Sequence, residues 1–164
     1  MHLGDTEAEK LRDVGLFGGL SDETLRAFTA PLEVVEFAAG TIVFNEGDAG
    51  REMFVVLGGR MEVIKRSKRD REVVVASLRQ GTWFGERSIL DVMPRPATVR
   101  AGEAARLLRV TAHDLDVLYR RDLKSYTLLV LNITREMSRQ LRLADGLLSD
   151  LMANLTDEYA PLRA

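Results

Sequence analysis

The sequence contains no cysteine and only two histidines among its 164 residues. Without cysteine the chain has no disulfide, thiolate metal site or cysteine nucleophile. The two histidines, His2 and His113, lie near the N-terminus and at the start of a helical region, so they do not form a pair of strand-borne metal ligands. A P-loop, a G-x-S-x-G motif and a Ser/His/Asp arrangement are also missing. We therefore expect neither an enzyme nor a metal cofactor.

Long apolar runs and a strong charge of either sign are missing too. No stretch approaches the roughly 18 to 20 apolar residues of a membrane helix, and the charged start MHLGDTEAEKLRDVG lacks the apolar core of a signal peptide. The 23 basic and 25 acidic residues give a net charge of −2, which argues against broad electrostatic binding to nucleic acid or to an anionic membrane. We expect a cytoplasmic protein with no membrane partner.

The composition that remains is typical of a globular protein, with 46% hydrophobic and 29% charged residues. The length suits one domain plus an appendage. Residues 6–16 and 21–30 are predicted to form short helices, the second capped by Ser21. After Pro31, short runs punctuated by glycine indicate an antiparallel sandwich or barrel; they are LEVVEF, TIVF, EMFVVL, RMEVIKR, EVVVASL, ATVRA and ARLLRV. The basic run KRSKRDR at 65–71 separates two of them and is interpreted as a solvated hairpin tip.

From about Asp114 the pattern is helical almost to the end of the chain. Its apolar residues recur at spacings of three and four with one extra four-residue step, which is typical of a heptad seam with a stutter. We predict that the C-terminal half of this helix pairs with its copy in a parallel homodimer, the alternative being a helix that covers its own domain. The seam consists of Leu123, Tyr126, Val130, Ile133, Met137, Leu141, Ala144, Leu148, Leu151 and Leu155.

The stretch FGERSILDVMPRPATVRA at residues 84–101 combines residue types that suit a phosphorylated sugar. Gly85 allows the backbone to approach a ligand closely, and a helical turn after it would offer free N–H groups to an anion. Arg95, flanked by two prolines, presents a planar fork for two phosphate oxygens from a stiffened segment, and ionised Glu86 can accept from a sugar hydroxyl. The spacing fits a ribose-phosphate clamp, and it equally fits a surface ion pair worth at most about 1 kcal/mol.

The same stretch resembles the phosphate-binding cassette of cyclic nucleotide-binding domains of the catabolite activator protein and protein kinase A regulatory-subunit type. That pattern is F-G-E, two or three small or apolar residues, a spacer, and P-R-x-A-T-V. The segments LFGGLSDETLRAF, FAAGTIVFNEGDAGREMFVVLGGRMEV and LRQGTWFGE resemble the family's N-terminal helices, its first strands with the E-G-D-x-G turn, and the lead-in to the cassette. The resemblance covers about residues 10–140.

The resemblance implies a mainly β fold with flanking helices: an antiparallel β-barrel of the jelly-roll or cupin-like type (a double-stranded β-helix), with N-terminal helices and a long C-terminal helix. The expected domains are a flexible tail at residues 1–9, a nucleotide-binding barrel with its flanking helices at 10–122, and the long helix, for dimerisation and signal output, at 123–164. Carried over position by position, the resemblance also implies that Glu86 binds the ribose 2′-hydroxyl and Arg95 the exocyclic phosphate oxygens. Other parts of this site are the backbone N–H groups of Gly85 and Ser88, and the motif residue Ala97.

Two positions depart from the family pattern. Pro96 follows the arginine, where alanine, serine or threonine is usual; it has no N–H, and the loss of one charge-assisted bond costs roughly 1.5 to 3 kcal/mol. Because Pro96 also lacks the hydroxyl that favours cGMP, cAMP is the expected ligand and cGMP the second candidate. Arg87 stands where leucine or another uncharged residue is usual, without a reason visible in the sequence. On the last helix, the adenine-facing positions fall near Ala144 and Asp145, and the Asp145 carboxylate either accepts from an exocyclic amine or is simply exposed.

The family resemblance therefore implies a cyclic-nucleotide sensor that signals through its C-terminal helix to an unidentified downstream protein. The alternative is a dimerising interaction module that keeps the fold without the ligand, a reading that Pro96 supports. Because no helix-turn-helix follows the long helix in this sequence, we expect no DNA binding by this chain.

Overall fold

The computed structural model describes Leu3 and residues 5–159. The chain begins with α1 (Asp5–Lys10), two 3-10 helices, η1 (Leu11–Asp13) and η2 (Gly15–Phe17), and α2 (Asp22–Thr29). The predicted helix at 6–16 is thus broken into three pieces, and α1 occupies half of the range predicted to be a flexible tail. His2 and residues 160–164 of the predicted C-terminal helix lie outside the described residues.

The Ser21 cap of α2 is confirmed. Its hydroxyl accepts a hydrogen bond from the backbone N–H of Thr24 at 3.2 Å, which satisfies one of the free donors of the first helical turn.

The strands form two antiparallel four-stranded sheets, as the alternating runs predicted, but the sheets do not close into a barrel. Among the described residues, β1 and β6 at the ends of one sheet and β2 and β5 at the ends of the other each pair with one neighbour, so both sheets have free edges. The predicted barrel is therefore corrected to a two-sheet jelly-roll sandwich. In spatial order, one sheet contains β1 (Glu33–Phe37), β8 (Ala105–Thr111), β3 (Glu52–Gly58) and β6 (Trp83–Phe84), and the other contains β2 (Ile42–Phe44), β7 (Thr98–Ala101), β4 (Arg60–Arg66) and β5 (Glu72–Arg79).

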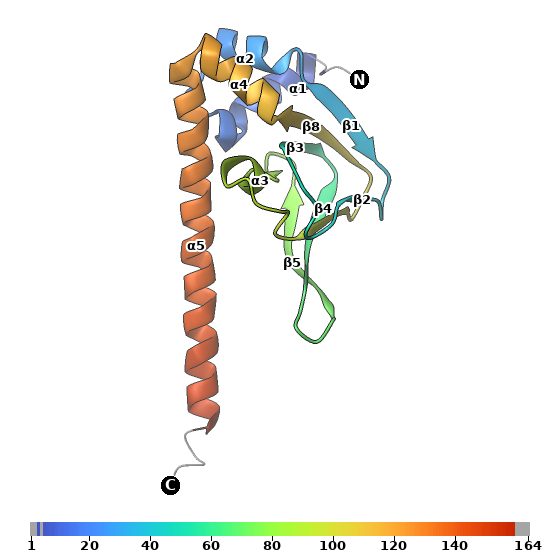
Figure 1. Ribbon diagram of the computed structural model, residues 1–164, viewed down its shortest axis with the longest axis vertical. Helices are drawn as coiled ribbons and strands as arrows, with labels where there is room; N and C mark the ends of the chain where they lie inside the picture. The colour runs from blue at the N-terminus through green and yellow to red at the C-terminus, as the bar shows by residue number, and fades with distance from the viewer. Residues whose placement is uncertain (1–2, 4, 160–164) are drawn as a thin grey trace.

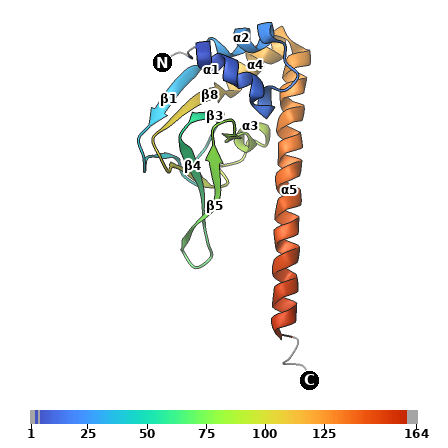
Figure 2. The same cartoon turned by 180° about the vertical axis from the view of Figure 1, so that it is seen from behind.

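The strands of the first sheet alternate between two hydrophobic clusters, as expected for a sheet covered on both faces. One face, with Met53, Val55 and Leu108, packs against the helices. The other face, with Phe54 and Leu107, packs against the second sheet. The helices α1, α2 and α4 (Ala112–Arg121) lie together at one end of the sandwich (Figures 1 and 2).

The β4–β5 hairpin extends beyond the sandwich (Figure 1). Its turn is closed by the Ser67 N–H, which donates to the Arg71 carbonyl at 2.8 Å. The interpretation of the basic run as a hairpin tip is therefore confirmed. The edge strand β5 is mostly exposed, and the register between β4 and β5 shifts between Val63 and Ile64.

The long helix α5 (Leu123–Tyr159) follows α4 after one residue and runs along one side of the sandwich before continuing past it (Figures 1 and 2). Leu129 and Ile133, which are 0% and 1% exposed, join the core under the helices. Of the seam predicted from spacing, Tyr126, Ile133 and Met137 pack against this core, as predicted. Leu123 is instead 58% exposed, and Leu129, absent from the predicted seam, is the most deeply buried of the described α5 residues. Of residues 141–155, every one is exposed.

Candidate functional site

The predicted cassette connects the two sheets of the sandwich. It leaves the first sheet at β6, turns at Gly85, forms the short helix α3 (Arg87–Leu90), and enters the second sheet at β7. Gly85 has a φ of +89°, and a Cβ there would lie 2.8 Å from Nη1 of Arg95 and 3.0 Å from the Glu52 carbonyl oxygen. Only glycine fits, because both the backbone conformation and the close approach exclude a side chain.

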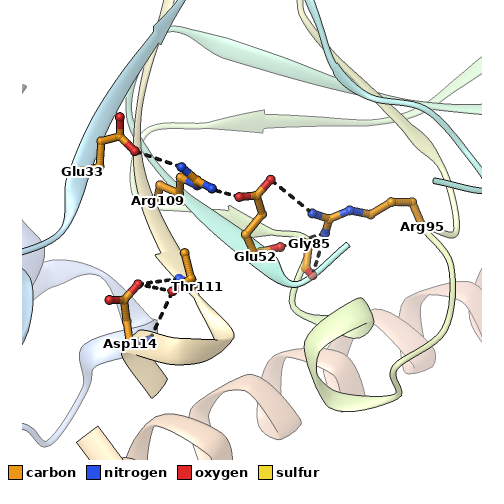
Figure 3. A network of polar contacts seen from close by, with 7 residues as sticks. All are labelled: Glu33, Glu52, Gly85, Arg95, Arg109, Thr111 and Asp114. Carbon is orange, nitrogen blue, oxygen red and sulfur yellow. Dashed lines mark hydrogen bonds and ion pairs between the residues drawn. The ribbon is translucent and has the colours of Figure 1, made fainter. Parts of the chain in front are cut away.

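Arg95 points from the cassette into the protein and is 2% exposed. Its Nη1 donates to the carbonyl oxygens of Glu52 at 2.8 Å and Gly85 at 3.0 Å, so the two ends of the cassette are tied together (Figure 3). Its guanidinium carbon lies 4.0 Å from the centre of the Phe44 ring, a cation–π arrangement. The Nε of Arg95 is buried and has no hydrogen-bond partner in the described part of the chain.

A series of ion pairs between carboxylates and guanidinium groups holds Arg95 in position (Figure 3). Glu52 Oε1 lies 4.0 Å from Nη2 of Arg95, and its Oε2 accepts from Nε of Arg109 at 2.6 Å. Arg109 in turn pairs with Glu33 at 3.0 Å across the β1–β8 ladder. Burial lowers the pKa of Arg95, and the carboxylates of Glu52, Asp48 and Glu86 act against that shift. The network therefore holds the guanidinium charged in one position.

Glu86 directly precedes α3 and is only 7% exposed. Burial raises the pKa of its carboxyl group, because the charged form loses solvation; its own backbone N–H and the charges of Arg87 and Arg95 lower it, and Glu136 of α5 raises it further. No other side chain donates a hydrogen bond to this carboxylate in the described part of the chain. A buried acceptor of this kind suits a ligand hydroxyl.

Ser88, in α3, is 2% exposed, and its Oγ has no hydrogen-bond partner among the described residues. Buried hydroxyls are normally paired, so an unpaired one at this position is consistent with a polar group arriving from outside. Among the described residues, the cassette thus has two buried donors without a partner, Oγ of Ser88 near its start and Nε of Arg95 near its end.

Arg87 is exposed on α3, and its Nη2 donates to Oε1 of Gln140 on α5 at 3.4 Å. Gln140 also donates to Glu136, one turn earlier, at 3.4 Å. Arg87 had no explanation in the sequence; the structure gives one, since this residue links the cassette helix to the long helix.

The end of the cassette is joined to the turn before β3 and to β4. The Gly47 N–H donates to the Arg95 carbonyl at 2.9 Å, and the Arg95 N–H donates to the Asp48 carbonyl at 2.8 Å. Lys65 of β4 donates from Nζ to Oε1 of Glu46 at 2.7 Å, and also to the carbonyl oxygen of Pro96. Pro96 itself is exposed and Ala97 is 7% exposed.

All of the predicted residues from Gly85 to Ala97 lie in the one segment between β6 and β7, and the structure brings Arg95 into hydrogen-bond contact with Gly85. Arg87 is directed to α5 instead, and Pro96 contacts Lys65. The structure does not bring Asp145 to this segment. Asp145 is exposed on the part of α5 that runs past the sandwich, more than one helical turn beyond Gln140, which contacts the cassette. Its adenine-binding role stays a prediction.

Three residues of the site were missed from the sequence. Phe44 stacks on Arg95, Glu52 anchors it, and Lys65 contacts the cassette end. Glu52 and Phe44 flank the E-G-D-A-G turn, so that turn was the available signal for the first two; Lys65 had been absorbed into the basic hairpin tip.

A cleft opens behind the cassette, between α3, α4 and α5. Glu86 contributes a buried carboxylate to the cleft, and Asp116 contributes a second carboxylate. The other side chains are aliphatic or aromatic: Met53, Ile89, Leu90, Ala112, Leu115, Tyr119, Tyr126, Val130 and Ile133. Arg95 does not line this cleft. In the described part of the chain, no group of three or more His, Cys, Asp or Glu residues could hold a metal ion.

The family model of the cyclic nucleotide-binding domain matches residues 34–122, more than half of the chain. This match covers the sandwich strands, the cassette and α4. The chain belongs to the cyclic nucleotide-binding domain family.

Individual relatives agree with this assignment. The chain is 39% identical over 104 residues, or 62% of its length, to a cAMP-dependent protein kinase regulatory subunit of Mycosarcoma maydis, of which it covers 20%. It is 28% identical over 148 residues, or 88% of its length, to a CRP-like cAMP-activated global transcriptional regulator of Mycobacterium tuberculosis, of which it covers 62%. The chain therefore spans less than two thirds of each of these relatives, both of which are named as regulatory proteins.

The fold has a close counterpart among solved structures. The crystal structure of a cyclic nucleotide-binding domain from Methylobacillus flagellatus superposes with a TM-score of 0.82 at 22% identity, covering 92% of this chain and 88% of that one. This likeness supports the two-sheet jelly roll with flanking helices. Among the described residues, none of the helices is long and apolar enough to span a membrane.

Proposed function

We propose that this chain is a cyclic-nucleotide sensor that binds cAMP in preference to cGMP. The observation that carries the proposal is the state of Arg95: a 2% exposed guanidinium, held by backbone carbonyls and Glu52, whose Nε has no partner. A buried cation with spare donors is costly unless an anion completes it. A cyclic phosphate supplies the exocyclic oxygens that a guanidinium fork binds best.

The remaining cassette residues suit the sugar and the phosphate. The Glu86 carboxylate accepts from the ribose 2′-hydroxyl, and the backbone N–H groups of Gly85 and Ser88 donate to the ligand. The unpartnered Ser88 Oγ and the glycine-only turn at Gly85 support these roles. The preference for cAMP rests on Pro96, which offers no hydroxyl to a guanine.

Signalling requires that the ligand change the free energy of whatever α5 contacts. One contact supports such a coupling, the hydrogen bond that Arg87 of the cassette helix donates to Gln140; Glu136 on the same helix also raises the pKa of the Glu86 carboxyl group by charge repulsion, after the larger effect of burial. When a nucleotide neutralises or moves groups of the cassette, α3 shifts against α5. The output passes to an unidentified downstream protein through the C-terminal half of α5.

The same half of α5 is proposed to form a parallel homodimer. Its exposed apolar residues are too numerous for an isolated helix in water, because burying them is the main source of helix–helix association. Seven of them are between 41% and 72% exposed: Leu141, Leu143, Leu147, Leu148, Leu151, Met152 and Leu155.

Isothermal titration of the protein with cAMP and cGMP, with 5′-AMP as the non-cyclic control, tests the ligand. We expect micromolar or tighter binding of a cyclic nucleotide and little binding of 5′-AMP. Arg95→Ala should weaken binding by about a hundredfold or more, because a charge-assisted bidentate contact is lost. Arg69→Ala, at the exposed hairpin tip, is the matched control and should bind as the parent does. Unchanged affinity in Arg95→Ala would remove the phosphate role.

Pro96 favours a second candidate, a dimerising module of the same fold that binds no nucleotide. It offers the phosphate neither an N–H nor a hydroxyl. No binding of either cyclic nucleotide at millimolar concentration would favour this module over the sensor.

A further inference from the structure

Lys65 lies near the end of β4, where its ammonium group contacts the end of the cassette at the Pro96 carbonyl oxygen. β4 pairs with β7 in unbroken register from Met61 to Ile64, so its side chains alternate between the two faces. Met61 and Val63 belong to the cluster between the sheets, and continued alternation would put Lys65 on the same side of β4, at the rim of that cluster. Phe44, whose ring carries Arg95, packs against the same cluster. Lys65 and Arg95 therefore both lie at the end of the cassette, Lys65 in contact with the residue that follows Arg95.

The ammonium group of Lys65 is held in place but has donor capacity left. One N–H is directed at Oε1 of Glu46, 2.7 Å away, and a second at the carbonyl oxygen of Pro96. A lysine ammonium has three donors, so one remains. The Lys65 side chain is 46% exposed, which leaves that donor open to a ligand.

Residue 96 lacks a backbone donor because it is proline. The charged donor that touches this residue is Lys65. We propose that Lys65 is an anion-binding residue of the nucleotide site, donating its remaining N–H to the cyclic phosphate and so replacing the amide that Pro96 cannot supply. This inference rests on the proposed function and adds a residue to its site.

The charges nearby support a role beyond structure. Three carboxylates, those of Glu52, Asp48 and Glu86, act on Arg95 before any ligand is present. The fields of these carboxylates partly offset the attraction of the guanidinium for the singly charged cyclic phosphate, so a second cation would strengthen the site. Lys65 adds a second positive charge on the open side of the cassette end, and Glu46 holds it there.

Titration calorimetry on four proteins tests the replacement: the parent, Lys65→Met, Pro96→Ala, and the double variant, each with cAMP. Methionine keeps the length of the lysine stem and removes the ammonium group, with its charge and its hydrogen bonds to Glu46 and Pro96. We expect Lys65→Met to weaken binding about tenfold or more. In the Pro96→Ala background, where residue 96 again carries an N–H, the same change should cost about threefold or less. Lys68→Met, at the exposed hairpin tip, should leave the affinity unchanged.

The outcomes separate the possibilities. An equal loss in both backgrounds would show that Lys65 only supports the loop around Glu46, which would overturn the inference. Parent-like binding by Lys65→Met would overturn it while leaving the sensor intact. No cAMP or cGMP binding by the parent would overturn the sensor and this inference together. Lys65→Arg is the charge-preserving control and should bind within about threefold of the parent. If it does, the weaker binding of Lys65→Met comes from the lost charge and not from a misfolded protein.

Discussion

The two halves of α5 carry similar numbers of apolar residues but have opposite environments. In the first half, Leu129 and Ile133 are almost completely buried, and Asn132 donates from Nδ2 to the carbonyl oxygens of Leu16 and Gly18 at 3.1 and 2.8 Å. In the second half, Leu143 and Leu147 are 69% and 72% exposed. One helix thus contains a segment that completes its own domain and a segment whose apolar surface has no cover within the described chain.

The contrast indicates that the two halves of α5 have different roles. The first half contacts residues far away in sequence, through hydrogen bonds as well as apolar packing, so it is part of the folded domain. The second half repeats leucine at helical spacing without such contacts, which is typical of a surface that pairs with another helix. The cassette contact from Arg87 to Gln140 falls at the junction of the two halves. A movement of the cassette would therefore be transmitted to α5 at Gln140, between the half that packs on the domain and the exposed half.

The largest expected effect comes from removing leucines of the free half. Replacing Leu148 and Leu151 by serine takes four leucine side chains out of the proposed dimer interface, each worth about 1.5 to 3 kcal/mol when fully buried. We expect the variant to be monomeric in light scattering at concentrations where the parent is dimeric. The control is the pair Thr127→Ser and Thr134→Ser, exposed positions on the first half, which should not change the mass. A dimer that persists in the serine variant would place the interface elsewhere.

The next effect is expected in the buried half. Leu129→Ala should lower the free energy of unfolding by about 2 to 5 kcal/mol, because it leaves a cavity in the core under the helices. Leu143→Ala, a matched leucine on the free half, should change the stability of the monomer by less than about 0.5 kcal/mol. Urea unfolding of both variants in the monomeric serine background measures the difference directly. Equal losses would mean that the free half is also packed within its own chain.

Much of this contrast could be predicted from the sequence, and the missing part has a clear cause. The heptad spacing predicted a long helix and an uncovered C-terminal stripe, but it placed Val130 rather than Leu129 in the seam. Spacing gives the period of a helix, whereas the rotation of its buried face depends on the surface it meets, here built mainly from α4 and η2. Asn132 is polar and so carried no hydrophobic signal, although it fixes that rotation through two hydrogen bonds.

In the candidate site, too, local features could be predicted from the sequence and long-range contacts could not. The F-G-E and P-R-x-A-T-V motifs predicted Gly85, Glu86 and Arg95, because these residues act through local backbone geometry and their own chemistry. Glu52 and Lys65 come from other strands, and only the pairing of those strands brings them to the cassette. The open edges of the two sheets were missed for a related reason: an alternating run predicts a strand, but it does not say whether that strand has one neighbour or two.

The smallest effect concerns Glu86, whose carboxyl group lies between the cassette and the domain-bound half of α5. Its pKa is raised above the ordinary value of 4.5, first by burial and also by Glu136. The folded protein therefore holds this proton more tightly than the unfolded chain. The resulting stability is fully present below the unfolded pKa and is lost as the pH rises through the raised folded pKa. Above that range, ionised Glu86 is a cost to the ligand-free protein.

Glu86→Gln removes that cost and should raise the free energy of unfolding at pH 7.5 by on the order of 1 kcal/mol. The gain should shrink as the pH falls towards 4.5, because glutamine then replaces a neutral carboxylic acid. Parallel urea titrations of both proteins at several pH values isolate the effect, since all other carboxyl groups contribute equally. The same variant should bind cAMP more weakly, because an amide is a poorer acceptor for the ribose hydroxyl. A parent protein as stable as the variant at pH 7.5 would mean that the carboxylate is already satisfied within the chain, and that Glu86 is retained for structure rather than for a ligand.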